Sequence, residues 1–116
     1  MTDDGFRASA RVIGDVAVLD LQGQIDAGAD AAIQSAYEQA EAGEPGSIAL
    51  NFSDVSYINS TGIALVVGIL ARARRAQKPV LAFGLTDHYR QIFEITRLAD
   101  FVEIHTDEAS ALARVP

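Results

Sequence analysis

Cysteine is absent from all 116 residues of the sequence. Disulfides, thiolate metal sites and cysteine nucleophiles are therefore excluded. Long apolar runs are missing as well: the longest, residues 63–71, is interrupted by Gly68 and is far shorter than the roughly 20 residues of a membrane span. The opening segment Met1-Thr2-Asp3-Asp4 is acidic and polar, which does not resemble a secretory signal. We therefore expect a cytoplasmic protein with no membrane partner.

Basic residues are few, because nine Lys and Arg oppose 16 Asp and Glu, which gives a formal net charge of −7. Nucleic acids and anionic lipids are bound by basic patches, so neither is an expected partner. One basic cluster stands out, and it consists of Arg72, Arg74, Arg75 and Lys78. These cations would complement the negative end of a helix, or they would form a patch at which a partner docks.

Residues suited to catalysis are also scarce. His88 and His105 are the two histidines, and neither lies in a metal-binding spacing of histidine and carboxylate. The glycines form neither a G-x-G-x-x-G pattern nor a P-loop, and no G-x-S-x-G nucleophile elbow occurs. The sequence therefore predicts no catalytic residue, no metal and no cofactor.

What the sequence does contain is an alternation of strand-like and helix-like segments. The expected strands are residues 6–12, 16–21, 47–52, 80–84 and 101–104. The expected helices are residues 27–42 and 63–77, a third capped by Thr86 and a fourth capped by Asp107. The resulting order, β-β-α-β-α-β-α-β-α, predicts one α/β domain over residues 1–116 with a loose terminus at 1–5. Its mixed sheet would begin with a hairpin and continue through parallel strands with right-handed crossovers.

Periodicity predicts which side chains are buried and where the chain turns. In the first long helix, the i, i+3, i+4, i+7 face consists of Ile33, Ala36, Tyr37 and Ala40. Residues 63–70 are apolar on nearly every side, so we expect them to pack on the sheet and Val67→Asp to unfold the protein. A loop is expected at 23–26 and a turn at Ser53-Asp54.

The segment Asn59-Ser60-Thr61-Gly62 places short polar side chains directly before the most apolar helix. Asn and Ser are good N-caps, but a cap requires only one such residue. Gly62 in a first helical turn costs about 1 kcal/mol relative to alanine. That cost is understandable if another backbone or a partner comes close. Local physics leaves a plain cap and a functional site as open alternatives.

Three stretches resemble the STAS domain, the fold of bacterial anti-sigma-factor antagonists and of the cytosolic tails of sulfate transporters. Residues 21–26 resemble the family's strand that ends in a Gly-x-(Leu/Ile)-Asp loop. Residues 48–63 resemble its central strand and its Asp-Ser-(Ser/Thr)-Gly signature, and residues 91–98 resemble its late helix. The element order agrees over nearly the whole chain, so the resemblance implies a single STAS-like domain.

The resemblance also implies a phospho-switch. Ser60 occupies the position that a partner anti-sigma factor, itself a serine kinase, phosphorylates in the antagonists; Thr61 is the competing acceptor nearby. The unphosphorylated antagonist binds the kinase and frees a sigma factor, and a phosphatase acting on Ser60 is a further implied partner. Asp26 matches the family's loop aspartate, although it is also a good helix N-cap. Asn59 departs from the usual aspartate, because it keeps the capping ability and lacks the charge.

The expected partner-binding surface therefore comprises Asp26, Asn59, Ser60, Thr61 and Gly62, in a protein that is a monomer or a weak dimer. Two alternatives remain at this stage. One is a STAS subunit of another assembly, such as a stressosome-like or lipid-transport complex. The other is a small α/β enzyme or ligand-binding domain that uses the same loop.

Overall fold

The computed structural model describes residues 5–114, so the loose terminus predicted at 1–5 lies almost entirely outside the described residues. The strands are β1 (Arg7–Ile13), β2 (Val16–Ile25), β3 (Ser47–Ile58), β4 (Val80–Phe83) and β5 (Glu103–His105). The helices are α1 (Asp30–Ala42), α2 (Ser60–Arg75), α3 (Asp87–Ile95) and α4 (Glu108–Leu112), with 3₁₀ turns η1 (Ala27–Ala29) and η2 (Leu98–Asp100). The predicted order of strands and α-helices is confirmed.

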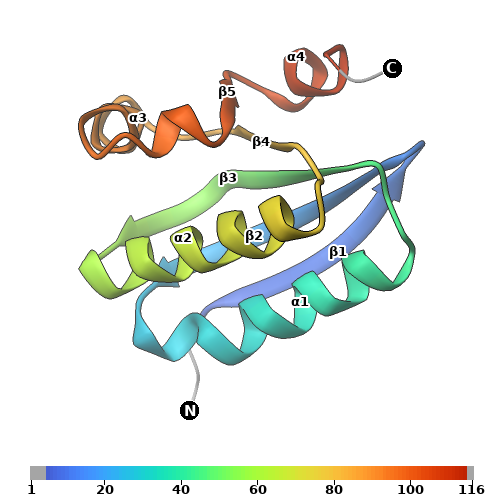
Figure 1. Cartoon of the computed structure of the whole chain (residues 1–116). Coiled ribbons are helices and arrows are strands. Elements are labelled where there is room, and N and C mark those ends of the chain that lie inside the picture. The colour runs from blue at the N-terminus through green and yellow to red at the C-terminus, as the bar shows by residue number, and fades with distance from the viewer. Residues whose placement is uncertain (1–4, 115–116) are drawn as a thin grey trace.

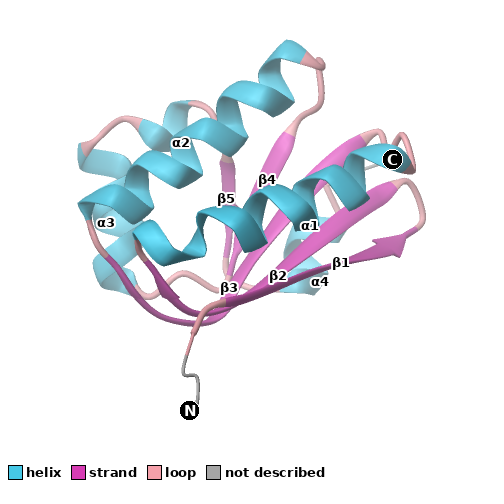
Figure 2. Cartoon of the chain, turned by 90° about the horizontal axis from the view of Figure 1, so that it is seen from below, coloured by secondary structure: helices cyan, strands magenta, loops and turns pink. Residues whose placement is uncertain are grey.

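The five strands form one mixed sheet in the order β1-β2-β3-β4-β5 (Figure 1). β1 and β2 are antiparallel and are joined by the tight turn at Gly14-Asp15. The remaining neighbours are parallel, as the alternation of strands and helices predicts. Helices α1, α2 and α3 cover one face of the sheet, whereas α4 lies on the other (Figure 2).

Alternation along each strand divides the apolar side chains between two cores. In β2, Ala17, Leu19 and Leu21 point into the larger core, beneath α1, α2 and α3. Val16 and Val18 point into the smaller core, beneath α4. The predicted buried face of α1 is confirmed, since Ile33, Ala36, Tyr37 and Ala40 are all buried.

The expectation for Val67 is wrong. α2 rests on the sheet along one face, and its buried residues are Gly62, Val66, Ile69, Leu70 and Ala73. Val66 is 2% exposed, whereas Val67 is 43% exposed. Successive helical residues point about 100° apart, so Val66 can face the sheet while Val67, at the margin of the buried face, points toward solvent. A sequence that is apolar all round did not reveal which of the two faces the sheet.

Several predicted boundaries also differ from the structure. β2 and β3 continue past the expected loop at 23–26 and the expected turn at Ser53-Asp54, because the two strands keep pairing as far as Ile25 and Ile58. The pairing accommodates the polar and glycine residues through two register shifts. Cross-strand pairing thus overrides local turn preference. Phe101 precedes β5 instead of starting it, and its side chain is 53% exposed.

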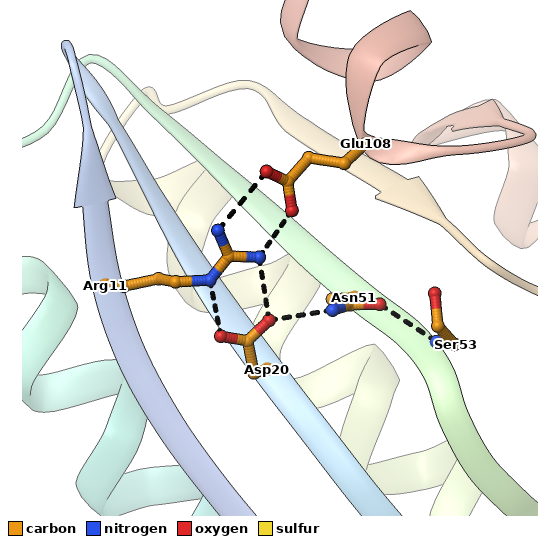
Figure 3. Close-up of polar contacts among 5 residues, drawn as sticks. All are labelled: Arg11, Asp20, Asn51, Ser53 and Glu108. Atoms are coloured by element: carbon orange, nitrogen blue, oxygen red, sulfur yellow. Dashed lines mark hydrogen bonds and ion pairs between the residues drawn. The ribbon is translucent and has the colours of Figure 1, made fainter.

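A charged cluster connects α4 to the sheet (Figure 3). Arg11 of β1 lies between two carboxylates: its Nε donates to Asp20 Oδ2 at 2.6 Å, and its guanidinium also binds Glu108 of α4. Asn51 Nδ2 donates to Asp20 Oδ1 at 2.7 Å. Burial alone would raise the pKa of Asp20, but the hydrogen bonds from Arg11 and Asn51 outweigh it and lower that pKa. One guanidinium therefore links β1, β2 and α4.

We expect Val66→Asp to destabilise the protein strongly, by about 3–5 kcal/mol, because it leaves an uncompensated charge in the core. Val67→Asp is the matched control, with the same chemical change one residue along the same helix. It should change stability by less than about 1 kcal/mol. Urea unfolding of both variants measures the difference. Equal losses would contradict the orientation of α2.

Candidate functional site

The candidate site lies where β2 and β3 end side by side. Ile25 and Ile58 are paired in the parallel ladder, and each is followed at once by a polar residue, Asp26 or Asn59. The carboxyl ends of parallel strands are where open α/β sheets commonly place their binding residues. Two loops from distant parts of the sequence thus meet at one edge.

Asn59 is the N-cap of α2. Its backbone is extended, and its Oδ1 accepts a hydrogen bond from the N–H of Gly62 at 2.8 Å. Its own N–H donates to the carbonyl oxygen of Ile25 at 3.2 Å. Asn59 therefore caps α2, so the hydroxyls of Ser60 and Thr61 are not required for capping.

Gly62 faces the end of β2 across a gap that no side chain could occupy. A Cβ placed on Gly62 would lie 1.9 Å from the carbonyl oxygen of Ile25 and 2.7 Å from its carbonyl carbon. The sequence left two explanations for this glycine, the close approach of another backbone or of a partner, and the structure shows the approach of the backbone of Ile25.

Ser60 and Thr61 are the first two residues of α2, and both are exposed. Within residues 5–114, the Ser60 hydroxyl takes part in no hydrogen bond. Both residues lie in the first helical turn, where backbone N–H groups lack intrahelical acceptors and the helix dipole is positive. An anion attached at this point would meet a favourable field.

Asp26 has a defined local role. Its Oδ1 accepts from the N–H of Gly28 at 2.9 Å, and it thereby caps η1. The expectation that Asp26 caps the first long helix is therefore met only in part, because Asp26 caps η1, whereas the N-cap of α1 is Ala29 and has no side-chain cap. Its side chain is only half-buried, so its other oxygen can also meet a partner.

Tyr89 of α3 is a site residue that the sequence analysis missed. Its hydroxyl accepts a hydrogen bond from the N–H of Ile58 at 2.9 Å, in a buried position. This bond holds the last residue of β3 immediately before Asn59. The sequence showed only a buried-type aromatic on a helix, and nothing in it joined Tyr89 to a loop some thirty residues earlier.

The histidines and carboxylates do not form a metal site among the described residues. His105 Nε2 lies 2.8 Å from Glu103 Oε1, and the rings of His88 and Tyr89 make an edge-to-face contact with centroids 4.9 Å apart. Over the same part of the chain, none of the helices combines the length and the apolar character needed to cross a bilayer.

A family model described as the STAS domain matches residues 7–111. The chain belongs to the STAS domain family. The anti-sigma-B factor antagonist of Listeria monocytogenes is 35% identical to it over 86 residues, which is 74% of this chain and 75% of that protein.

The fold is also shared with solved structures of other proteins. An anti-sigma factor antagonist from Mycobacterium paratuberculosis superposes with a TM-score of 0.83 at 18% identity, covering 98% of this chain and 97% of the other. The Bacillus cell fate determinant SpoIIAA in its phosphorylated form superposes with a TM-score of 0.71 at 24% identity, covering 97% and 100%. At such identities, the likeness establishes the common architecture of this STAS domain.

The N-cap role of Asn59 leads to a direct prediction. Asn59→Ala should lower the stability by about 0.5–2 kcal/mol, because the N–H of Gly62 loses its acceptor. Asn59→Asp should stay close to the wild type, since aspartate caps about as well. Thermal or urea unfolding separates the two. An alanine variant as stable as the aspartate variant would show that the cap is dispensable.

The close approach at Gly62 predicts that Gly62→Ala destabilises the protein by about 1–3 kcal/mol, as overpacking does. Gly68→Ala is the control in the same helix, since the added Cβ has no atom within 4 Å apart from those of its chain neighbours and of the surrounding helix backbone. That change should stabilise the protein by up to about 1 kcal/mol through helix propensity. Stabilisation by both substitutions would disprove the backbone contact.

Proposed function

We propose that Ser60 is the regulatory phosphorylation site of this STAS domain and that Asp26, Asn59, Thr61 and Gly62 surround it in the partner-binding surface. Its curated relatives are anti-sigma-B factor antagonists, and this chain is an anti-sigma-factor antagonist like them. The observation that carries the proposal for Ser60 is its exposed, unbonded hydroxyl at the start of a helix whose cap is another residue.

This choice is supported by the fact that Asn59 caps α2, whereas the Ser60 hydroxyl makes no hydrogen bond within the described residues. Phosphorylation adds about −1.5 to −2 charges and three acceptor oxygens. Because Asn59 supplies the cap, modification of Ser60 removes no hydrogen bond on which α2 depends. The first turn of the helix favours an added anion, so the fold survives while the surface changes in charge and bulk. A partner that fits the neutral surface is then excluded.

Thr61 is the competing acceptor, because it is also exposed in the first turn. Ser60 is favoured because it is the first hydroxyl residue of the family signature, whereas Thr61 is the second. The neutral Asn59 beside it places no negative charge next to the incoming phosphate. Asp26 contributes a carboxylate from the neighbouring loop, which can bind the partner without joining any chemistry.

The partner in this proposal is an anti-sigma factor that is also a serine kinase. It binds the unphosphorylated chain and then releases its sigma factor, whereas a phosphatase acting on Ser60 restores the binding form. The part played by this chain is binding, not catalysis. Because sigma factors work with RNA polymerase, the proposal places the chain in the cytoplasm.

Ser60→Ala should fold, keep its affinity for the anti-sigma kinase and resist phosphorylation. Ser60→Asp should fold as well, because an acid suits the first turn, but should bind the kinase at least about tenfold more weakly, or about 1.4 kcal/mol. Thr61→Ala is the matched control and should still be phosphorylated. Phosphopeptide mapping with kinase and ATP, together with calorimetric binding, measures these outcomes.

Phosphate on Thr61 in place of Ser60 would move the switch by one residue. Phosphate on neither residue, combined with unchanged binding of Ser60→Asp, would remove the phospho-switch.

A further inference from the structure

The C-terminal half of α2 and the turn η2 enclose an apolar hollow on the surface. Its volume is about 200 Å³, and it is lined by Val67, Leu70, Ala71, Arg74, Leu98 and Phe101. Leu70 and Leu98 are buried and form its floor, whereas Val67 and Phe101 are exposed walls. An adjoining hollow of about 370 Å³ shares Leu70, Arg74 and Phe101 and extends toward Lys78. We call the two together the α2–η2 groove.

The exposed side of α2 leads into this groove as a stripe of small and apolar residues. Ala64, Val67, Ala71 and Arg74 are all exposed, and they follow one another at intervals of three, four and three residues. Residues at this spacing share one face of a helix. The stripe therefore resembles the seam that one amphipathic helix offers to another, yet its apolar members Ala64, Val67 and Ala71 stay exposed.

The basic cluster noted in the sequence is divided between two sides of α2. Arg72 turns toward α1, where it binds Gln34 at 2.6 Å and Glu41 at 3.2 Å and stacks on Tyr37. Arg74 turns the other way, and its guanidinium lies 5.3 Å above the ring of Phe101. One arginine therefore serves the fold, whereas the other belongs to the groove.

The groove is basic although the protein is acidic. Neither Arg74 nor Arg75 forms an ion pair in the part of the chain that the structure describes. Lys78 also lines the groove, and the acid at its rim, Asp100, is neutralised by Arg97 at 2.8 Å. A partner that combines apolar and acidic side chains would complement this apolar floor and its unpaired arginines.

We propose that the α2–η2 groove is a docking site for an acidic amphipathic helix of a partner protein. Such a helix would place apolar side chains at i, i+3 or i+4, and i+7 along Val67, Ala71 and Phe101. Its flanking carboxylates would meet Arg74 and Arg75. This inference goes beyond the proposed function and does not depend on the modification of Ser60.

Other occupants fit the groove less well. A second copy bound about a two-fold axis would bring the same arginines against one another, because such a contact repeats one patch on both subunits. A small ligand usually occupies a pocket of about 300–1,000 Å³ that encloses most of its surface. Both hollows lie open on the surface beside the exposed Phe101, so they would not enclose a small ligand and suit the side chains of a docked helix instead.

The test is an NMR titration of the full ¹⁵N-labelled chain with a synthetic helix-forming peptide of about 15 residues. At about this length an isolated helix begins to be stable in water. The peptide carries leucine at i, i+3 and i+7 and glutamate on its flanks. We expect amide shifts centred on Val67, Ala71 and Phe101. A counterpart with lysine in place of glutamate should bind at least about tenfold more weakly.

Two variants locate the site. Phe101→Ser should abolish the shifts, and Arg74→Glu should weaken the glutamate peptide about tenfold while improving the lysine peptide. The matched controls are Ile95→Ser, an 80% exposed apolar side chain outside the groove, and Arg7→Glu, the same charge change on β1. Both controls should bind the glutamate peptide as the wild type does. Spectra without peptide report whether each variant is folded.

Several results would overturn the proposal. These are the absence of shifts in the groove at millimolar peptide, equal binding of the two peptides, and equal losses in the controls. Shifts of Val67 and Phe101 that grow with protein concentration alone would show that a second copy occupies the groove. None of these outcomes bears on the phosphorylation of Ser60, so the two proposals fail separately.

Discussion

The carbonyl oxygen of Ile25, at the end of β2, is the point on which the site is built. It accepts the N–H of Asn59 at 3.2 Å, and the missing side chain of Gly62 lets the first turn of α2 lie against it. A helix with any larger residue at this position would have to move away from the strand. Because that contact and the cap of Asn59 set where α2 begins, they also set where Ser60 and Thr61 meet solvent.

Other contacts hold the surroundings of this point. Tyr89 bonds the N–H of Ile58, so α3 fixes the end of β3 from the side opposite Ile25. On the far face of the sheet, Arg11 joins β1, β2 and α4 through two carboxylates. The loops at the carboxyl ends of the strands are therefore supported by contacts from several elements, and the proposed phosphorylation of Ser60 would change the charge of a surface whose shape these contacts define.

α2 carries two different surfaces along its length. At its start, a neutral cap and an exposed hydroxyl occupy the positive end of the helix dipole, where a phosphate is tolerated. At its end, cations complement the negative dipole, and Arg74 also closes over Phe101 at the edge of an apolar groove. The helix can thus present the proposed modification site and the proposed docking face without any change in how its buried side packs on the sheet.

Much of this protein was determined by local sequence. The order of strands and helices, the buried face of α1, and the caps Thr86 and Asp107 follow from periodicity and capping chemistry, which depend on neighbouring residues. The family signature placed Ser60 at the start of a helix.

Other features were decided by tertiary structure alone. The side of α2 that is buried, with Val66 inside and Val67 outside, depends on where the sheet lies, because both residues are apolar. The extra length of β2 and β3 depends on their pairing, which outweighs the turn preference of Ser53-Asp54. The bond from Ile58 to Tyr89, and the groove that Phe101 forms with Val67, join residues about thirty positions apart, and no local pattern records such contacts.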